Sequence, residues 1–350
     1  MNILVVRLGA LGDLVHTIPA VSALRTALPD ARIDWVVEAR HRAIVDLVEG
    51  IDRVVAIEGR TLGAWTDALR RLREVPYDLA LDFQGLMKSA VLARASGAAR
   101  VAGFSIWHLR EKGARPFYSE TDEAGGRPGD ESPPGEHVIQ KNLRLLRVAG
   151  IETARVQFPI VRALSAAAQE TIGTYGERGY ALLNPGAAWP NKRWPEDRFG
   201  EVAAFLRDVR GLPSLVLWGP GEEPLARAVA GLSGGAAAVA PPTSVADVVE
   251  LARGAALMVS GDTGPLHLAA AVGTPSVAIF GPTDPARNGP WSALDEVVTR
   301  YETCGCHYDR RCHQPRWCLL GVSVAEVTAA IQQRLSHAGP PGREPRAHDA

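Results

Sequence analysis

Residues 257–271 combine side chains and backbone that could bind a phosphate group. An apolar run at 257–259 predicts a buried strand, residues 260–264 a turn, and residues 265–271 a helix with proline in its first turn. Free N–H groups and the positive dipole end of such a helix attract anions. An ordinary helix cap explains the same turn equally well. The residues that would face the anion are Asp262, Thr263, Gly264 and His267.

A second strand–turn–helix junction, at the start of the chain, carries a carboxylate. Residues 2–6 predict a buried strand, a glycine-bearing turn follows, and residues 14–28 have helical periodicity. The turn lacks G-x-G-x-x-G spacing and an acidic residue placed to bind a ribose, which disfavours a nicotinamide or flavin enzyme. It presents Asp13 at a helix start, with Arg7 and His16 nearby in sequence. Asp13 is therefore either a cap or a residue with a chemical role.

Three further turns follow predicted strands in the second half of the chain. Residues 184–195 supply small residues that let backbone approach a phosphate, together with the point charge of Lys192. In the next turn Glu222 could hydrogen-bond a sugar hydroxyl, and residues 280–285 form the third. Several such turns aimed at one crevice are difficult to attribute to folding alone. The small residues of the first turn include Gly186, Ala187 and Ala188.

Strands and helices alternate along both halves of the chain. The predicted strands of the first half are residues 2–6, 32–37, 53–57, 79–83 and 100–104. Those of the second half are residues 181–184, 215–218, 257–259 and 277–280. This alternation predicts an α/β protein with two doubly wound parallel sheets.

The predicted elements divide the chain into two domains and a tail. A linker at 153–162 separates the halves, so we expect domains at 1–155 and 156–335 that face each other across a cleft. Residues 120–136 are acidic and rich in glycine and proline, which predicts a mobile loop. Residues 336–350 predict a disordered tail.

Length and composition are those of a globular protein with two domains. The chain has 350 residues, of which 46% are hydrophobic and 22% charged, enough to bury two cores. No apolar run reaches the roughly 20 residues of a membrane span, and the N-terminus enters a strand rather than a signal segment. We therefore expect a cytoplasmic protein. A net charge of −1 gives no general attraction to nucleic acid, so no nucleic-acid partner is expected.

Local charge indicates where an anionic substrate could bind. From Lys88 to Arg115 the sequence has six lysines or arginines and one acidic residue. Such a cluster is either a solvated face or a surface that receives an anionic substrate.

All four cysteines lie in one short segment, in the pattern C-x-C-x5-C-x5-C. Disulfides are unusual in the cytoplasm, so these thiols could hold a structural Zn²⁺ or Fe ion through four ligands. The spacing is not that of paired C-x2-C knuckles, and reduced, partly buried thiols explain it as well. The residues are Cys304, Cys306, Cys312 and Cys318.

Together these motifs resemble glycosyltransferase family 9, the bacterial heptosyltransferases of the lipopolysaccharide inner core. The resemblance spans residues 1–335. It rests on Leu-Gly-Asp-Leu-Val-His-Thr-Ile-Pro at 11–19, Asp-Phe-Gln-Gly-Leu-Met-Lys-Ser-Ala at 82–90, Lys-Arg-Trp-Pro at 192–195, Asp-Thr-Gly-Pro-Leu-His at 262–267 and Gly-Pro-Thr-Asp-Pro at 281–285. The element at 84–90 looks most like that of the type I enzymes, which transfer the first heptose.

The resemblance implies a GT-B fold and an inverting transfer of L-glycero-D-manno-heptose. The implied donor is ADP-heptose, and the implied acceptor is a Kdo-containing lipid A precursor at the inner membrane surface. Asp13 is implied as general base, with no cofactor required for catalysis. The implied donor site contains Gly186, Ala187, Ala188, Lys192, Glu222, Asp262, Thr263, Gly264 and His267. The implied acceptor residues are Arg60, Gln84, Lys88 and Arg115.

Other interpretations use the same residues. A type II heptosyltransferase, or another family 9 transferase, would take a different acceptor. A nucleotide-sugar-binding protein, or an epimerase of the same fold, would use the donor site without transfer. The presence of Asp13 argues against a protein that only binds. The resemblance implies a location in the cytoplasm or on the cytoplasmic face of the inner membrane.

Overall fold

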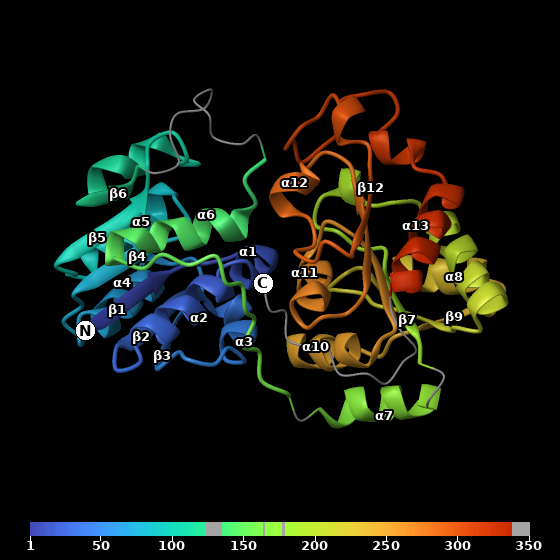
Figure 1. Ribbon diagram of the computed structural model, residues 1–350, viewed down its shortest axis with the longest axis horizontal. Coiled ribbons are helices and arrows are strands. Elements are labelled where there is room, and N and C mark those ends of the chain that lie inside the picture. Colours follow the sequence, from blue (N-terminus) through green and yellow to red (C-terminus); the bar gives the residue numbers. More distant parts are fainter. Residues whose placement is uncertain (124–134, 164, 177–178, 338–350) are drawn as a thin grey trace. The chain divides into compact units, whose positions relative to one another are not determined.

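The computed structural model describes residues 1–123, 135–163, 165–176 and 179–337. By its internal contacts the chain divides into two units, Met1–Arg162 and Ala163–Ala350, which Figure 1 draws in sequence colours. We expected the division after residue 155, whereas the contacts place it after Arg162. The difference arises because residues between these two positions pair with the first unit. Glu49 donates its N–H to the carbonyl oxygen of Pro159 at 2.9 Å, and Ile160 forms an antiparallel bridge with Val48.

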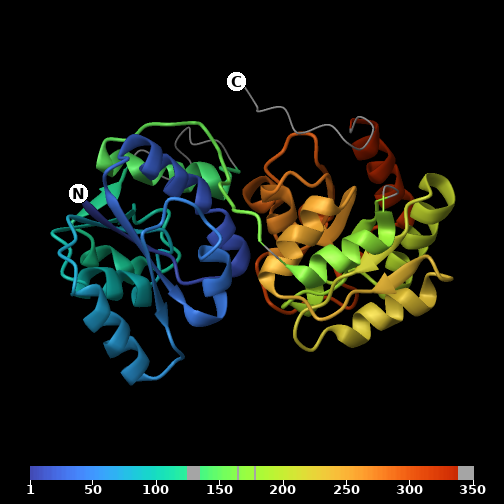
Figure 2. The same ribbon diagram turned by 90° about the horizontal axis from the view of Figure 1, so that it is seen from below.

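The N-terminal unit is built on one sheet of six parallel strands, in the order β3-β2-β1-β4-β5-β6. The strands are β1 (Asn2–Val6), β2 (Arg32–Glu38), β3 (Arg53–Ile57), β4 (Leu79–Asp82), β5 (Arg100–Phe104) and β6 (Glu120–Asp122). Helices lie on both faces of this sheet (Figure 2). On one face lie α2 (Ile18–Ala27) and α6 (Val138–Leu145), and on the other α4 (Leu62–Leu72) and α5 (Met87–Ala95).

The C-terminal unit repeats this topology with parallel strands in the order β12-β11-β10-β7-β8-β9. The strands are β7 (Ala181–Asn184), β8 (Ser214–Val216), β9 (Ala237–Val239), β10 (Leu257–Gly261), β11 (Ser276–Phe280) and β12 (Glu296–Thr299). One face carries α8 (Glu196–Arg210), α9 (Glu223–Leu232) and α13 (Val324–His337). The other carries α7 (Ala166–Tyr175), α10 (Val245–Gly254) and α11 (Gly264–Ala271).

Side chains of the second sheet alternate between two cores, one on each face. In β7, Leu183 packs into the core under α8, α9 and α13, whereas Leu182 packs into the core under the opposite helices. In β10, Val259 and Met258 alternate in the same way. All four side chains are fully buried. Parallel strands buried on both faces form continuous apolar runs in the sequence, which is why the runs predicted them.

Every strand predicted from the sequence is present, with small shifts in its bounds. The helix expected at 14–28 is instead two helices, α1 (Leu11–Val15) and α2. They separate because Pro19 lacks an N–H, and in a continuous helix its ring would clash with the carbonyl of Val15.

Two segments expected to lack regular structure begin with ordered residues. The loop expected at 120–136 begins with β6, and residues 124–134 lie outside the described residues. Ser336 and His337, expected in the tail, belong to α13, and residues 338–350 lie outside the described residues.

The strand order creates one switch point in each sheet, where neighbouring strands lead away in opposite directions. It lies between β1 and β4 in the first sheet and between β7 and β10 in the second. In open parallel sheets, ligands bind outside the carboxyl ends of the strands at this point. We therefore expect a ligand-binding site at the turns after these four strands.

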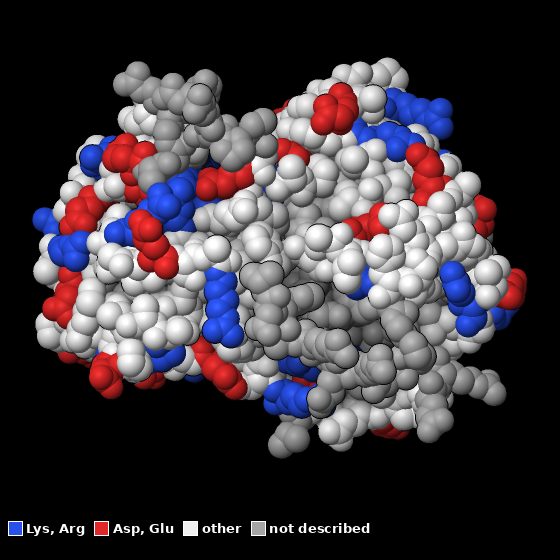
Figure 3. Space-filling view, in the orientation of Figure 1, with Lys and Arg blue, Asp and Glu red and all other residues white. Residues whose placement is uncertain are grey.

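The distribution of charge on the outer surface does not indicate where a ligand binds. Basic and acidic side chains are interspersed on the face drawn in Figure 3. Among the helices of the described ranges, none has the length and apolar character needed to cross a bilayer.

Candidate active site

Asp13 lies in α1, directly after the turn that follows β1, and an ion pair holds it there. Its Oδ2 is 2.6 Å from a guanidinium nitrogen of Arg7 and faces the N–H of Ala10 at 3.4 Å, so the roles of ion-pair partner and cap coexist. Arg7 is buried and donates to the carbonyl oxygen of Phe83, which follows β4. The side chain of Asp13 is 32% exposed, which leaves the carboxylate accessible to a substrate.

Glu38, which the sequence analysis did not select, is the last residue of β2 and lies, like the turn that carries Asp13, at the carboxyl ends of the strands. Its carboxylate is 2.7 Å from Lys88 Nζ and 2.6 Å from a guanidinium nitrogen of Arg40. Burial alone would raise the pKa of Glu38, but Lys88 and Arg40 lower it below its ordinary value. The carboxylate therefore stays ionised and fixes the Lys88 ammonium.

His41 is a second residue that sequence reasoning missed. It lies against Gly9, where an added Cβ atom would be 2.7 Å from the imidazole ring. Burial and the charge of Arg40 lower the pKa of His41, although Glu38 and Asp13 oppose them. Glu38 ends β2 and His41 lies three residues later, at the carboxyl end of the strand, so the same rule that selected Asp13 would have found them.

Two of the residues expected to bind an acceptor are brought next to the β1 turn. Gln84 Oε1 accepts the N–H of Leu8 at 2.7 Å, which ties the turn after β4 to the turn after β1. Lys88, in the first turn of α5, forms an ion pair with Glu38 at the end of β2.

The other two expected acceptor residues lie on neighbouring segments. Arg115 belongs to the 3-10 helix η2 (Lys112–Phe117), which packs against α5, and donates to the carbonyl oxygen of Tyr118 at 3.2 Å. Arg60 is exposed in the bend after the edge strand β3, two strands away from β1. The proposed roles of Arg60 and Arg115 rest on the family resemblance.

In the C-terminal unit, Asp262 is the centre of a buried polar cluster at the switch point. Its Oδ2 is 2.5 Å from Lys192 Nζ and accepts the hydroxyl of Thr283 at 2.7 Å, and its Oδ1 is 3.1 Å from His267 Nε2. Asp262 and His267 are both buried. Burial alone would raise the pKa of Asp262, but the hydrogen bond with His267 and the charge of Lys192 lower it well below its ordinary value. Asp262 is thus an ionised anchor for its protein neighbours.

Lys192 is positioned by backbone as well as by charge. It ends the 3-10 helix η5 (Pro190–Lys192), and its Nζ lies 4.4 Å from the ring centroid of Trp189. At Gly261, the last residue of β10, an added Cβ atom would be 2.8 Å from the carbonyl oxygen of Lys192. This close approach requires glycine and places the Lys192 backbone beside the end of β10, while Asp262 holds the ammonium.

Thr263 is the N-cap of helix α11, which begins at Gly264, one residue before the start that the sequence predicted. The Thr263 hydroxyl makes no capping hydrogen bond. It accepts Asn184 Nδ2 at 3.0 Å and lies 3.0 Å from Ser260 Oγ, which joins the ends of β7 and β10. The first-turn N–H groups of α11 are therefore not used by this side chain and can meet an anion.

Three small residues follow β7 and bring backbone next to Glu222. An added Cβ atom at Gly186 would be 2.1 Å from Glu222 Oε2, which also accepts the N–H of Gly219 at 3.1 Å. Arg193 donates to the carbonyl oxygen of Ala187 at 2.9 Å, and its guanidinium group lies 3.7 Å from Glu222 Oε1. The turns after β7 and β8 therefore meet. The three small residues are Gly186, Ala187 and Ala188.

The four cysteines give no support to the zinc or iron site that their spacing had indicated. Within the described ranges, no group of three or more cysteine, histidine, aspartate or glutamate side chains is placed to hold a metal ion. None of the four thiols is in a disulfide. Cys306 and Cys312 instead form a pair, with their sulfur atoms 3.4 Å apart.

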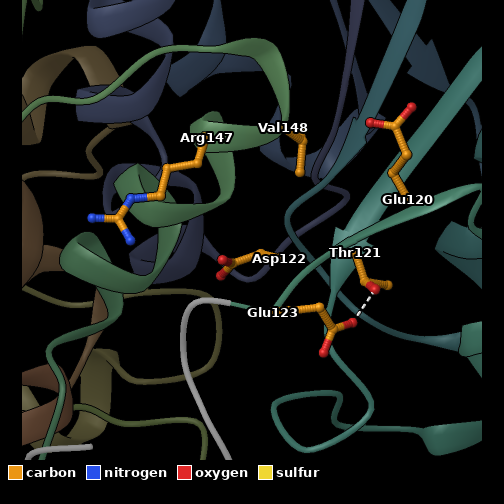
Figure 4. Close-up of a pocket in the computed structure, with 6 residues that line it drawn as sticks. All are labelled: Glu120, Thr121, Asp122, Glu123, Arg147 and Val148. Carbon is orange, nitrogen blue, oxygen red and sulfur yellow. Dashed lines mark hydrogen bonds between the residues drawn. The ribbon is translucent and has the colours of Figure 1, made fainter.

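A cavity of about 380 Å³ in the N-terminal unit contains none of the expected residues. It lies at the edge strand β6, and its carboxylates make it unsuited to a phosphate ligand. Arg144 forms an ion pair with one of these carboxylates, that of Asp122. Figure 4 labels the lining residues, which are Glu120, Thr121, Asp122, Glu123, Arg147 and Val148.

Known proteins resemble this chain over most of its length. A family model for glycosyltransferase family 9 (heptosyltransferase) matches residues 65–318. Lipopolysaccharide heptosyltransferase 1 of Pseudomonas aeruginosa is 33% identical over 314 residues, which cover 83% of this chain and 81% of the relative.

Solved structures give the same result. The Escherichia coli heptosyltransferase WaaC with ADP has a TM-score of 0.73 and 25% identity, over 96% of this chain and 98% of that chain. The same enzyme with ADP-2-deoxy-2-fluoro heptose has a TM-score of 0.73 and 25% identity, over 95% and 99%. The two six-stranded sheets are thus those of the GT-B-like fold, and the chain belongs to glycosyltransferase family 9 (heptosyltransferase).

Proposed function

We propose that this chain is an inverting glycosyltransferase that moves L-glycero-D-manno-heptose from ADP-heptose to a Kdo-containing lipid A precursor. Its similarity to a protein named lipopolysaccharide heptosyltransferase 1 supports the activity. Its likeness to a structure with ADP-2-deoxy-2-fluoro heptose supports the donor. The observation that carries the proposal is the Lys192–Asp262 ion pair, 2.5 Å long, next to the start of α11.

We assign the donor to the C-terminal unit. In the transfer, the bond from the anomeric carbon to the β-phosphate oxygen breaks, and the electron pair leaves with ADP. The Lys192 ammonium and the first N–H groups of α11 would stabilise that negative charge, so this mechanism uses no metal ion. Asp262 positions Lys192 through their ion pair, and Asp262 is itself held by hydrogen bonds with His267 and Thr283.

We assign the acceptor to the N-terminal unit, with Asp13 as the base. The Asp13 carboxylate would take the proton from the acceptor hydroxyl as its oxygen attacks the anomeric carbon. Arg7 holds one carboxylate oxygen, which orients the other. The residues that would meet the acceptor's carboxylates and phosphates are Arg60, Gln84, Lys88 and Arg115.

Release of ADP tests the transfer. Purified protein with ADP-heptose should release ADP only when a deacylated acceptor bearing Kdo is added, and the product should gain one heptose by mass. A protein that only binds nucleotide sugars would bind ADP-heptose without release. An acceptor that already carries one heptose, used in a parallel reaction, separates the first-heptose enzyme from a type II enzyme.

We further infer that the enzyme meets its acceptor at an anionic membrane surface. Four large apolar side chains of the N-terminal unit are exposed, two on α5 and two in the turn after β5: Met87 (39%), Val91 (43%), Ile106 (39%) and Trp107 (43%). Exposed cations lie among these residues or three to five residues after them in sequence, which suits anionic headgroups. These are Lys88, Arg94, Arg110 and Lys112. We call these eight residues the apolar–basic surface.

The two segments of the apolar–basic surface are tied together. Glu111 accepts the N–H of Met87 at 2.7 Å and donates its own N–H to the carbonyl oxygen of Gly85 at 3.2 Å. An added Cβ atom at Gly113 would lie 2.8 Å from the sulfur of Met87. The turn after β5 and helix α5 therefore present their exposed side chains from adjoining segments.

Vesicle flotation tests this inference. The protein should float with vesicles containing phosphatidylglycerol, and less with phosphatidylcholine alone. Val91→Ser with Trp107→Ser should reduce flotation by about tenfold, because two exposed apolar side chains that would enter the membrane are lost. Val209→Ser, at a 55% exposed position on α8, is the matched control. Equal flotation of the double variant and the wild type would contradict the inference.

A further inference from the structure

The cysteine segment contains a pair of thiols that the proposed reaction does not use. Cys306 Sγ and Cys312 Sγ are 3.4 Å apart. Cys306 is buried and Cys312 is partly exposed. We propose that Cys306 and Cys312 form a reversible thiol-oxidation site that reacts with low-molecular-weight disulfides and, when oxidised, weakens the donor site. The second clause rests on the proposed function, whereas the first does not.

The surroundings favour this pair over the other two cysteines. The N–H of His313 donates to Cys306 Sγ at 3.2 Å, and this hydrogen bond lowers the pKa of the Cys306 thiol. A hydrogen-bond donor of this kind stabilises a thiolate. Burial raises the pKa of both Cys312 and Cys318, so packing is what separates these two thiols. The sulfur of Cys318 packs 3.0 Å from the position of an added Cβ atom at Gly281, whereas that of Cys312 lies next to Cys306.

The oxidation follows ordinary thiol–disulfide exchange. The more exposed Cys312, as its thiolate, attacks one sulfur of the small disulfide, forms a mixed disulfide and releases one small thiolate. The Cys306 thiolate then attacks Cys312 Sγ, forms the Cys306–Cys312 bond and releases the second small thiolate. The two protons lost by the protein thiols end on the two small thiolates. Two protein thiols are oxidised, and one small disulfide is reduced to two thiols.

The residues between the two thiols hold the turns of the donor site. Tyr308 donates its N–H to the carbonyl oxygen of Pro282 at 2.8 Å, and Pro282 precedes Thr283. The carbonyl oxygen of Asp309 accepts Nδ2 of the buried Asn191 at 3.0 Å, and Asn191 precedes Lys192. Thr283 and Lys192 are both direct partners of Asp262. The loop closed by the two cysteines thus contacts both segments that hold this carboxylate.

Formation of the bond must contract this loop. The sulfur atoms would move from 3.4 Å apart to about 2.05 Å, the length of a disulfide. Contraction lengthens the contacts of Tyr308 and Asp309 with the donor turns, and a lengthened contact leaves the buried Asn191 amide poorly paired. We therefore expect the affinity for ADP to fall on oxidation.

Peptide mapping of the whole protein tests the thiol chemistry directly. After incubation with oxidised glutathione, alkylation without reduction should show two of the four thiols lost and one peptide pair joined through residues 306 and 312. Dithiothreitol should restore all four thiols. Four reactive thiols after oxidation, a disulfide between other cysteines, or a stoichiometric zinc or iron ion that protects the thiols until chelation would each overturn the proposal.

Calorimetry with ADP tests the coupling. The dissociation constant for ADP should rise by about threefold or more on oxidation and return on reduction. Cys312→Ser should remove this response while it keeps the reduced-state affinity, and Cys304→Ser should keep the response. An oxidised protein with the 306–312 bond and unchanged ADP affinity overturns the coupling alone. Failure of heptose transfer with normal thiol mapping would instead overturn the proposed function.

Discussion

The two carboxylates at the switch points differ in their exposure. Asp262 is buried and contacts Lys192, His267 and Thr283 within 3.1 Å. Asp13 has a side chain that is 32% exposed and pairs with Arg7 through one oxygen. A base must reach a substrate proton, so exposure favours Asp13 for that role, whereas Asp262 is suited to positioning.

Replacement of Asp13 separates chemistry from binding. Asp13→Asn keeps the shape of the side chain but cannot accept the proton, so we expect turnover to fall by roughly 10²-fold or more with unchanged ADP affinity. Initial rates of ADP release and calorimetry measure the two quantities. Asp46→Asn, at an exposed carboxylate paired with Arg42, is the control. Near-normal turnover in Asp13→Asn would exclude it as the base.

The depressed pKa of Asp262 predicts how stability depends on pH. Its pKa is lower in the folded protein than in the unfolded chain, where aspartate titrates near about 3.9. The ionised carboxylate therefore stabilises the fold above about pH 4, and that contribution is lost as pH falls towards the folded-state pKa.

Asp262→Asn should accordingly destabilise the protein at pH 7 by about 3 kcal/mol or more, because the Lys192 ammonium loses its counter-ion in a largely buried place. The difference from the wild type should shrink below about pH 4. Urea unfolding at pH 7, 5 and about 3.5 measures it. A difference that stays constant over this range would count against an ionised Asp262.

At the scale of elements, every interior strand was predicted, whereas of the four edge strands only β3 was predicted. The interior strands β1, β4, β7 and β10 each contain a run of three or four apolar residues and were predicted. The strands missed were β6, β9 and β12, which all lie at sheet edges. Edge strands have one pairing partner and a partly exposed face, so short sequences such as Glu-Thr-Asp suffice. Sequence periodicity contains little signal for them.

The end of β10 offers a test of how elements position a side chain. In Gly261→Ala the new methyl group would lie 2.8 Å from the Lys192 carbonyl oxygen, so η5 must move. We expect a loss of about 1–3 kcal/mol in the free energy of unfolding from overpacking and about tenfold weaker ADP binding. Denaturation and calorimetry measure these quantities.

Gly231→Ala is the matched control, because an added Cβ atom in α9 meets open space. Its stability should be unchanged or higher by about 0.5–1 kcal/mol, since alanine favours a helix. If Gly261→Ala bound ADP like the wild type, the backbone contact would not be what positions Lys192.

At the scale of the whole molecule, sequence reasoning grouped the turns into one site but did not predict which side chains contact each other. Lys192 and Asp262, 70 residues apart, were expected in the same donor site, whereas their contact at 2.5 Å was not predicted. The Lys88–Glu38 ion pair joins residues 50 apart, and only Lys88 was expected. Such pairs depend on strand order, which places β4 beside β1 and β10 beside β7. Local patterns predict strands and turns, whereas neighbours across a sheet are decided by topology.

The division into two units predicts that donor binding is separable from transfer. The second sheet and the two hydrophobic clusters on its faces lie wholly within the C-terminal unit, so residues 163–350 should fold alone with one cooperative transition. That fragment should bind ADP within about tenfold of the full chain and should transfer no heptose, because it lacks Asp13. Lys192→Ala in the same fragment should weaken ADP binding by about 1.5–3 kcal/mol, the value of a charge-assisted contact. Arg227→Ala, which removes an exposed ion pair on α9, should leave ADP binding unchanged. A folded fragment that fails to bind ADP would show that the donor is not held by the C-terminal unit alone.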